Sequence, residues 1–231
     1  MEKGAAPTLF NDSVEDLLGR AVCRRAESVE EKEQIYRLRY RSYFREGTVS
    51  VREDERFTDS FDQEPNSWSF GIYVDGFLAS SLRLSIAEPE FPALPATHVF
   101  PDIIEPMLEA GKTIVDPTRF VVDYEAAKAH AKLPYITVRI GWLALRYYTA
   151  NVSLATVRSE HQAFYRRLFG HRLICPPRPY PTLLKPISVM ALDYTETERE
   201  RVERRYPFLR SDAAERDKLF APLPGKVPDA A

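Results

Sequence analysis

The chain is short of cysteine and has no long hydrophobic run, and each shortage excludes a class of protein. Its 231 residues include two cysteines, Cys23 and Cys175, which stand far apart and form no C-x-x-C pair. A zinc site built on paired cysteines is therefore excluded, and we expect two reduced, buried thiols. No apolar run approaches the roughly 18 residues that predict a membrane-spanning helix.

The chain also lacks a large excess of charge of either sign. The 32 basic and 34 acidic residues leave a formal net charge of −2, so the whole molecule lacks the positive field that attracts nucleic acid or an anionic membrane. The N-terminus has no apolar segment of the kind found in secretory signals, so we expect a cytoplasmic protein. Hydrophobic residues make up 44% of the chain, which is enough for a sizeable packed core.

Hydrophobic periodicity predicts an α/β fold with a mixed central β-sheet flanked by helices. The clearest local signals are a capping box at Ser28 and Glu31 and a hairpin turn at Asp75-Gly76. Pro117 lies inside a predicted strand, which indicates a bulge or an edge there, because proline cannot donate to a central ladder. The predicted strands are 21–26, 113–123, 152–157, 172–175 and 183–192 with a hairpin over 68–86, and the predicted helices are 29–44, 101–111, 134–150 and 160–169.

Composition divides the chain into three parts. Residues 1–19 are expected to form a tail or a lead-in helix, residues 20–193 the folded domain, and residues 194–231 a charged helical tail. Within the domain, residues 45–67 carry seven acidic residues and little periodicity. A long loop in a compact domain is often functional, so we expect a loop or lid at a binding site.

Charged residues interrupt several apolar segments. Arg39 lies in YRLRYRSYF and Arg83 in SLRLS, while Asp116 and Arg119 share DPTRFVV. Each has an ordinary interpretation, a solvated side chain or a local ion pair. Charges inside a protein are costly unless they are paired, so together with the loop carboxylates they predict a buried network that also holds a polar substrate headgroup. Those loop carboxylates are Asp59 and Asp62.

Taken in order, these motifs resemble a known family. LRYRSYF at 38–44, the D-x-x-D pair at 59–62, SLRL at 81–84 and D-x-x-R-F at 116–120 resemble the acyl-homoserine lactone synthases. The stretch 157–181, VRSEHQAFYRRLFGHRLICPPRPYP, is similar to a sister group, the N-acyl amino acid synthases. The resemblance covers about residues 22–193 and implies the GNAT acyltransferase fold. It also implies transfer of a long fatty acyl group from acyl carrier protein to the amine of an amino acid.

The resemblance also implies residue roles. Asp116 falls where the lactone synthases usually place a glutamate, proposed as the base for the attacking amine. Tyr165 lies near where GNAT enzymes often place an acid for the departing thiolate, although a packed aromatic is the alternative. His161 and His130 are further acid–base candidates. The substrate-binding positions it implies, together with an apolar strip for the acyl chain that ordinary core packing also explains, are Arg39, Asp59, Asp62, Arg83, Arg119, Phe120, Val122, Trp142, Leu143 and Leu145.

One absence bears on the donor. GNAT acetyltransferases usually carry a glycine-rich loop whose backbone N–H groups hold the coenzyme A pyrophosphate. Here that place reads YEAAKAHAKLPY at 124–135, without glycine. Phosphopantetheine on a carrier protein has a single phosphate, so we expect acyl carrier protein rather than acyl-CoA as donor, and no permanently bound cofactor or metal.

A carrier protein is acidic, so its docking surface is expected to be locally basic. Arg139 and Arg146 lie seven residues apart and therefore on one helix face. Arg166, Arg167 and Arg172 cluster at the end of the next helix. Solvation, or pairing with nearby glutamates, is the alternative for all five arginines.

Three hypotheses follow for the function. The first is an N-acyl amino acid synthase. The second is a lactone synthase that uses S-adenosylmethionine, which is disfavoured because residues 45–52, REGTVSVR, lack the tryptophan typical of that family. The third is a GNAT-fold acyl-binding module without turnover, suggested by aspartate in place of the usual glutamate at position 116.

Overall fold

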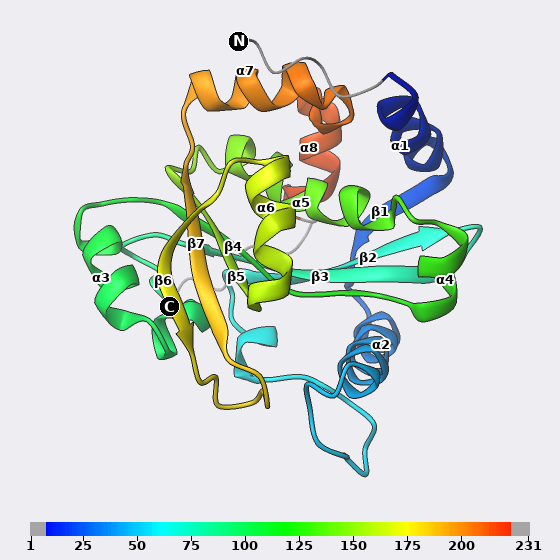
Figure 1. The fold of residues 1–231 in the computed structure, drawn as a ribbon, viewed down its shortest axis with the longest axis horizontal. Helices are drawn as coiled ribbons and strands as arrows, with labels where there is room; N and C mark the ends of the chain where they lie inside the picture. Colours follow the sequence, from blue (N-terminus) through cyan, green and yellow to red (C-terminus); the bar gives the residue numbers. More distant parts are fainter. Residues whose placement is uncertain (1–7, 223–231) are drawn as a thin grey trace.

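The computed structural model describes residues 8–222, in which a mixed sheet of seven strands carries helices on both faces (Figure 1). The strands run in the order β1-β2-β3-β4-β5-β7-β6, and each neighbouring pair is antiparallel except β4 and β5. Their bounds are Ala21–Arg25 (β1), Ser67–Val74 (β2), Phe77–Ala87 (β3), Ile114–Val122 (β4), Val152–Val157 (β5), Arg172–Arg178 (β6) and Ile187–Asp193 (β7).

The helices divide between the two faces. In Figure 1, α2 lies on one side of the sheet, and α1, α5, α6, α7 and α8 lie on the other. The helix bounds are Thr8–Arg20 (α1), Val29–Arg45 (α2), Pro101–Glu109 (α3), Tyr124–Ala129 (α4), Leu133–Tyr147 (α5), Gln162–Leu168 (α6), Glu196–Arg205 (α7) and Ala213–Phe220 (α8). Short 3₁₀ turns occur at Ser60–Asp62 (η1), Pro95–His98 (η2), Ser159–His161 (η3) and Pro207–Leu209 (η4).

The parallel pair opens a gap in the middle of the sheet. Strands β4 and β5 pair only at Ile114 with Val152 and at Val115 with Ser153, and then they separate. Pro117 follows just beyond the last pair and has no N–H to donate. The sheet therefore splits beside Asp116 and Pro117, and this split positions the candidate site.

Several local predictions are confirmed. Ser28 and Glu31 form the capping box at the start of α2. The β2–β3 turn places both Asp75 and Gly76 at positive φ, 51° and 82°, as a two-residue hairpin turn with the twist of the sheet requires. Strand β5 has the predicted bounds. Strand β7, predicted from residue 183, begins only at Ile187, because the preceding residues bond elsewhere, as in the hydrogen bond from the Leu184 N–H to the Thr48 carbonyl.

Of the bulge or edge predicted at Pro117, the structure shows the edge, because within residues 8–222 β4 has no partner there on the side of β5. Pro117 pairs in register with Leu84 of β3. The register slips further along β4, opposite the step from Ser81 to Arg83, and there Arg119 adopts a φ of 53°. A positive φ is strained for arginine, so the bulge turns Arg119 out of the regular alternation of the strand.

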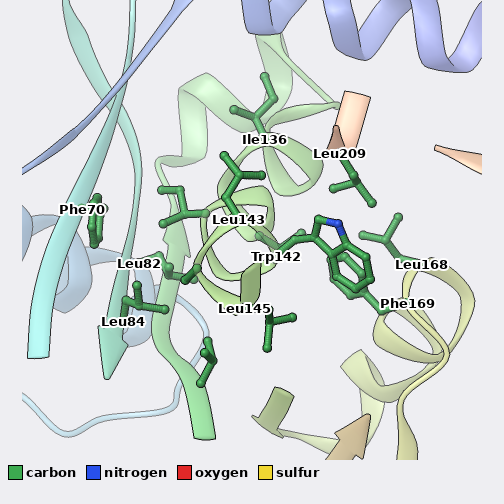
Figure 2. Packing of buried hydrophobic residues seen from close by; sticks show 14 of the residues in the cluster. Phe70, Leu82, Leu84, Ile136, Trp142, Leu143, Leu145, Leu168, Phe169 and Leu209 are labelled. Carbon is green, nitrogen blue, oxygen red and sulfur yellow. The ribbon is translucent and has the colours of Figure 1, made fainter. Parts of the chain in front are cut away.

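The predicted lead-in and tail are part of the main core. Val14 and Leu17 of α1, and Val202 and Phe220 of α7 and α8, are buried in the same cluster as Trp142. Figure 2 shows Trp142 of α5 against Phe169, with Leu168 and Leu209 beside them. Residues 1–7 and 223–231 of the predicted end segments lie outside the described residues.

Cys23 and Cys175 are free thiols; Cys175 is buried as predicted, whereas Cys23 is only half-buried. Between residues 8 and 222 no helix is long and apolar enough to cross a bilayer.

Candidate active site

One face of the sheet carries rows of polar side chains. Ser69 of β2, Arg83 of β3 and Thr118 of β4 lie opposite one another, and the next row contains Ser85 and Asp116. Side chains alternate between the faces of a strand, so these residues share the face toward α2, whereas Leu82 and Leu84 of β3 belong to the core on the other face. This polar face is the base of the candidate site.

Arg39 of α2 reaches down to this face. Its side chain is fully buried, with 0% exposed, and its Nη1 donates to Asp62 Oδ1 at 2.8 Å while Nη2 donates to Ser69 Oγ at 2.7 Å. The alternative of a solvated helix arginine is therefore excluded. Burial lowers the pKa of Arg39, and attraction by Asp62 opposes that effect.

Asp59 joins the other two arginines. Arg83 Nη1 donates to Asp59 Oδ1 and Arg119 Nη2 to Asp59 Oδ2, each at 2.5 Å. Arg119 is therefore paired across the site rather than with its neighbour Asp116. The Arg119 guanidinium also lies 4.4 Å from the centre of the Phe57 ring, so it is bound by one charge and one aromatic face.

The short turn η1 sets the two aspartates. Asp59 is its N-cap and accepts from the Phe61 N–H at 3.0 Å, while Asp62 Oδ2 accepts from the Asp59 N–H at 3.2 Å. Each carboxylate thus accepts hydrogen bonds both from the backbone of the turn and from arginine. Burial alone would raise the pKa of Asp62, but Arg39 and Arg83 outweigh burial and lower it to about 2.

Polar atoms within the site remain unpartnered. Arg83 is 0% exposed and donates through Nε to Thr118 and through Nη1 to Asp59, yet its Nη2 has no hydrogen-bond partner in the described part of the chain. Asp116 Oδ2 is likewise unpartnered among residues 8–222. Buried polar groups are rarely left unpaired. A polar ligand that forms hydrogen bonds with this donor and this acceptor is therefore expected to bind here.

Asp116 itself is 0% exposed. Its Oδ1 accepts a hydrogen bond of 3.1 Å from Thr156 of β5, across the split between the strands. Burial raises the pKa of Asp116 to about 6, opposed by Thr156 and Arg83. A carboxylate with this pKa is mostly ionised at neutral pH and is more basic than an exposed aspartate, which suits a general base.

Tyr165 approaches Asp116 from the other face of the sheet. It is buried on α6, and its pKa is raised by burial first and then by the nearby Tyr43 and Asp116. The hydroxyl therefore keeps its proton at neutral pH. Asp116 and Tyr165 thus place a proton acceptor and a proton donor near one another at the split in the sheet.

The residues predicted to line an acyl tunnel lie around α5 and β4. Phe120 and Val122 are half-buried and pack at the edge of the main core, and Leu143 and Leu145 are buried within it. Trp142 stacks on Phe169 with ring centres 5.2 Å apart, and its Nε1 donates to Glu203. Trp142 also lines a small cavity with Pro117.

Arg139 is a correction to the predicted docking surface. It is 6% exposed and donates to Glu215 and to the carbonyls of Phe208 and Arg210, so α8 and η4 cover it. Sequence spacing placed Arg139 on the face of Arg146, which is exposed, but could not show that α8 covers one end of that face. Arg172 is exposed and pairs with Asp193.

Arg166 and Arg167 are exposed on α6. This helix packs against the start of α5, where the Phe164 and Tyr135 ring centres are 5.4 Å apart. Arg167 lies near Tyr135 at the N-terminal end of α5, the end at which the missing glycine loop would stand. His161 lies against Arg158 and near Glu46, and His130 is the C-cap of α4.

Sequence reasoning missed several residues of the site. Thr156, Thr118 and Ser69 bind the charged side chains, and Tyr43 lies near both Tyr165 and Arg119. Threonines and serines in strands are common, so only the alternation of faces offered a signal, and alternation does not identify the neighbouring strand.

Comparisons with known proteins identify the family and the fold of the chain. The family of the N-acyl amino acid synthase FeeM matches residues 34–193. The structure of FeeM from uncultured soil microbes has a TM-score of 0.64 and 17% identity, covering 80% of this chain and 97% of that one. The CoA-dependent acyl-homoserine lactone synthase MesI has a TM-score of 0.55 and 19% identity, covering 83% and 97%. BjaI, a CoA-dependent acyl-homoserine lactone synthase with SAM and isopentyl-CoA, has a TM-score of 0.54 and 14% identity, covering 81% and 90%. No curated protein sequence matches the chain.

Proposed function

Because the chain belongs to the family of the N-acyl amino acid synthase FeeM, and is thus an acyltransferase with a GNAT-like fold, we propose that it transfers a long fatty acyl group to the amine of an amino acid. The observation that carries the choice of acceptor is the pair of unpartnered atoms on Arg83 and Asp116, within the described chain. One is a cationic donor and the other an anionic acceptor. An amino acid carries the complementary pair, a carboxylate and an amine.

In the proposed complex the acceptor carboxylate binds Arg83 and its amine faces Asp116. Guanidinium binds carboxylate more strongly than a neutral donor does. Asp59 and Asp62 hold Arg83 in place, and Arg119 holds Asp59, rather than contacting the acceptor amine. Because Arg83 and Asp116 are buried, binding requires the covering loops around Phe57 and Thr182 to move, and Arg119 contacts both residues.

The proposed reaction is attack of the amine nitrogen on the thioester carbonyl carbon. The new C–N bond forms as the C–S bond breaks, Asp116 takes the proton that the amine loses, and Tyr165 protonates the departing thiolate. Backbone N–H groups at the Arg119 bulge are candidates for holding the oxyanion. Proton transfer by positioned groups contributes about 10²–10⁴-fold to such a rate.

We propose acyl carrier protein as the donor, with acyl-CoA as the alternative. Residues 124–129 form the short helix α4 where a glycine loop would hold a pyrophosphate. Arg166, Arg167 and Arg172 are the proposed docking residues, with Arg146 more distant. The proposed acyl site follows the split between β4 and β5 toward Phe120 and Trp142.

A lactone synthase that uses S-adenosylmethionine is the second candidate, favoured by the likeness to BjaI and MesI. S-adenosylmethionine has the same carboxylate and amine, so Arg83 and Asp116 suit it equally. A mixture of amino acids and S-adenosylmethionine, supplied with acyl carrier protein loaded with a long acyl chain, distinguishes the two by mass spectrometry. N-acyl amino acids support the proposal, whereas homoserine lactones with methylthioadenosine support the alternative. Binding of the acyl donor without any product indicates a module without turnover.

A further inference from the structure

Thr156 of β5 is joined to Asp116 of β4 across the split in the sheet. The Thr156 hydroxyl donates to Asp116 Oδ1 at 3.1 Å. The backbones of the two strands pair only as far as Val115 with Ser153, so this hydrogen bond lies beyond the last pair of the ladder. It is a link between side chains of two strands that have already separated.

The other edge of β5 holds Thr156 in a fixed position. Thr156 pairs with Val189 of β7, in an antiparallel ladder that includes all six residues of β5. At the next residue, Ser188 Oγ donates to the Val157 carbonyl at 2.8 Å. The Thr156 hydroxyl therefore reaches Asp116 from a strand that is fully paired along its other edge.

The hydrogen bond makes the two carboxylate oxygens of Asp116 different. Among residues 8–222, Oδ1 accepts from Thr156 and Oδ2 has no partner. The terminal torsion of an aspartate side chain is broad, so an orienting bond decides which oxygen points where. Rotation of the carboxylate would exchange the two oxygens and would break the bond to Thr156. Oδ2 is therefore the oxygen that is left to accept from a bound amine.

Three other titratable groups lie near Asp116. They are Arg83, Tyr165 and Tyr180, and burial raises the pKa of both tyrosines, which therefore stay protonated at neutral pH. Burial raises the pKa of Asp116 to about 6, opposed first by the hydrogen bond from Thr156 and then by Arg83. Loss of that hydrogen bond therefore raises the pKa further, because the ionised carboxylate loses a donor.

We infer that Thr156 is a positioning residue for the acyl transfer: its hydroxyl holds the Asp116 carboxylate so that Oδ2 faces the acceptor amine. The inference rests on the proposed function, since it takes Asp116 as the base. Thr156 binds Oδ1 and not the reacting atoms, so it acts on the amine through Asp116. Without its hydroxyl, Asp116 is both less well oriented and less ionised at neutral pH.

The test replaces Thr156 with valine, which keeps the shape of the side chain without the hydroxyl, and with serine, which keeps the hydroxyl. NMR of the Asp116 carboxyl carbon, assigned with Asp116→Asn, follows its titration. We expect a wild-type midpoint of about 6, and a midpoint higher by about one pH unit in Thr156→Val, as the loss of one hydrogen bond provides. Thr156→Ser should keep the wild-type midpoint. Thr113→Val, the same change at a half-buried residue just before β4, is the control and should also keep it.

The pH profile of kcat/KM is the second measurement. In Thr156→Val its acid limb should move upward together with the NMR midpoint. At pH 9, where Asp116 is ionised in both proteins, kcat should remain about tenfold below the wild-type value, because the base is no longer oriented. Thr156→Ser should restore the acid limb and most of the rate.

The inference is overturned if folded Thr156→Val keeps both the wild-type midpoint and the wild-type profile, or if Thr156→Ser behaves as Thr156→Val does. Thr156→Ala takes the place of the valine variant if that variant does not fold. When the wild type makes N-acyl product and both measurements are unchanged, the proposed function stands and the role of Thr156 is contradicted. An absence of N-acyl product from the wild type contradicts the proposed function, and with it the role of Thr156 toward the amine, even where the titration shifts as expected.

Discussion

Arg83 and Asp116 lie on adjacent strands and on the same face of the sheet, two pairs apart along the ladder between β3 and β4. Arg83 pairs with Thr118, and Asp116 pairs with Ser85. In the part of the chain that the structure describes, each keeps one buried polar atom without a partner, Nη2 on the arginine and Oδ2 on the aspartate. Substituting Arg83 or Asp116 is therefore expected to weaken binding of the amino acid more than binding of the acyl donor.

Arg83→Lys tests the carboxylate site. Lysine keeps the charge beside Asp59 but lacks the planar fork that serves two partners. We expect kcat/KM for the amino acid to fall about 10- to 100-fold, chiefly through KM, with the KM of the acyl donor nearly unchanged. Steady-state kinetics with each substrate varied in turn measures this. Arg37→Lys, at an exposed arginine of α2 that pairs with Glu33, is the control, and an equal loss in both KM values contradicts the assignment.

Asp116→Asn separates activity from stability. The raised pKa of about 6 means that ionised Asp116 opposes folding, a cost that appears as the pH rises from about 4 to 6 and is complete above 6. We expect the variant to be more stable at pH 8 by about 3 kcal/mol and slower by at least about 10²-fold. Urea unfolding at pH 8 and at pH 4 measures the first effect, which should vanish at the lower pH.

The same residue sets the acid limb of the activity profile. If Asp116 is the base, wild-type kcat/KM rises with pH up to about 6 and then levels. A profile that is flat between pH 5 and 8, with chemistry limiting, argues against Asp116 as the base.

Asp62 is expected to govern stability in acid. Its pKa is about 2 in the folded protein against an ordinary value of 3.8, so the stability it contributes is present above about pH 4 and is lost as the pH falls toward 2. The contribution is about 2 kcal/mol. Unfolding of Asp62→Asn should depend less steeply on pH in this range than that of the wild type. Asp54→Asn, at an exposed carboxylate, should leave the wild-type slope unchanged.

Reversing Arg166 and Arg167 to glutamate tests the carrier-protein surface. With acyl carrier protein as donor we expect kcat/KM to fall at least about tenfold, and added salt to weaken the wild type. Acyl-pantetheine skips docking, so both proteins should use it equally. Arg204→Glu, an equally exposed arginine on α7, is the matched control. Equal losses with both donors indicate a defect in the site or the fold and contradict docking on α6.

Gly141→Ala tests the packing that holds the split strand. A Cβ at Gly141 would lie 2.7 Å from Cγ of Pro117, and the ring of proline has little freedom to move. We expect a loss of about 1–3 kcal/mol of stability. Gly19→Ala in α1, where the new Cβ meets nothing within 4 Å, should instead be neutral or stabilising by up to about 1 kcal/mol. Thermal unfolding of both variants checks this contrast.

Local chemistry in the sequence was sufficient for the order of the strands and of most helices, but it did not predict the short helix α4. The capping box at Ser28 and the Asp75-Gly76 turn depend on residues next to one another, and the structure confirms both. The buried charges followed from the same kind of reasoning, since Arg39 and Arg83 interrupt apolar segments and need partners. Their motif order also indicated the acyltransferase family.

Only the tertiary structure decided which groups meet. Pro117 and Arg119 stand two residues apart, yet the bulge falls at Arg119, because the pairing with β3 sets the register. Arg139 has the spacing of a surface arginine but is covered by α8, which comes far later in the chain. The burial of His171 was not predicted either, because side chains from four separate elements enclose it. The sequence determined the elements and the charges that need partners, whereas burial and the choice of partner depend on contacts between distant segments, which no local pattern encodes.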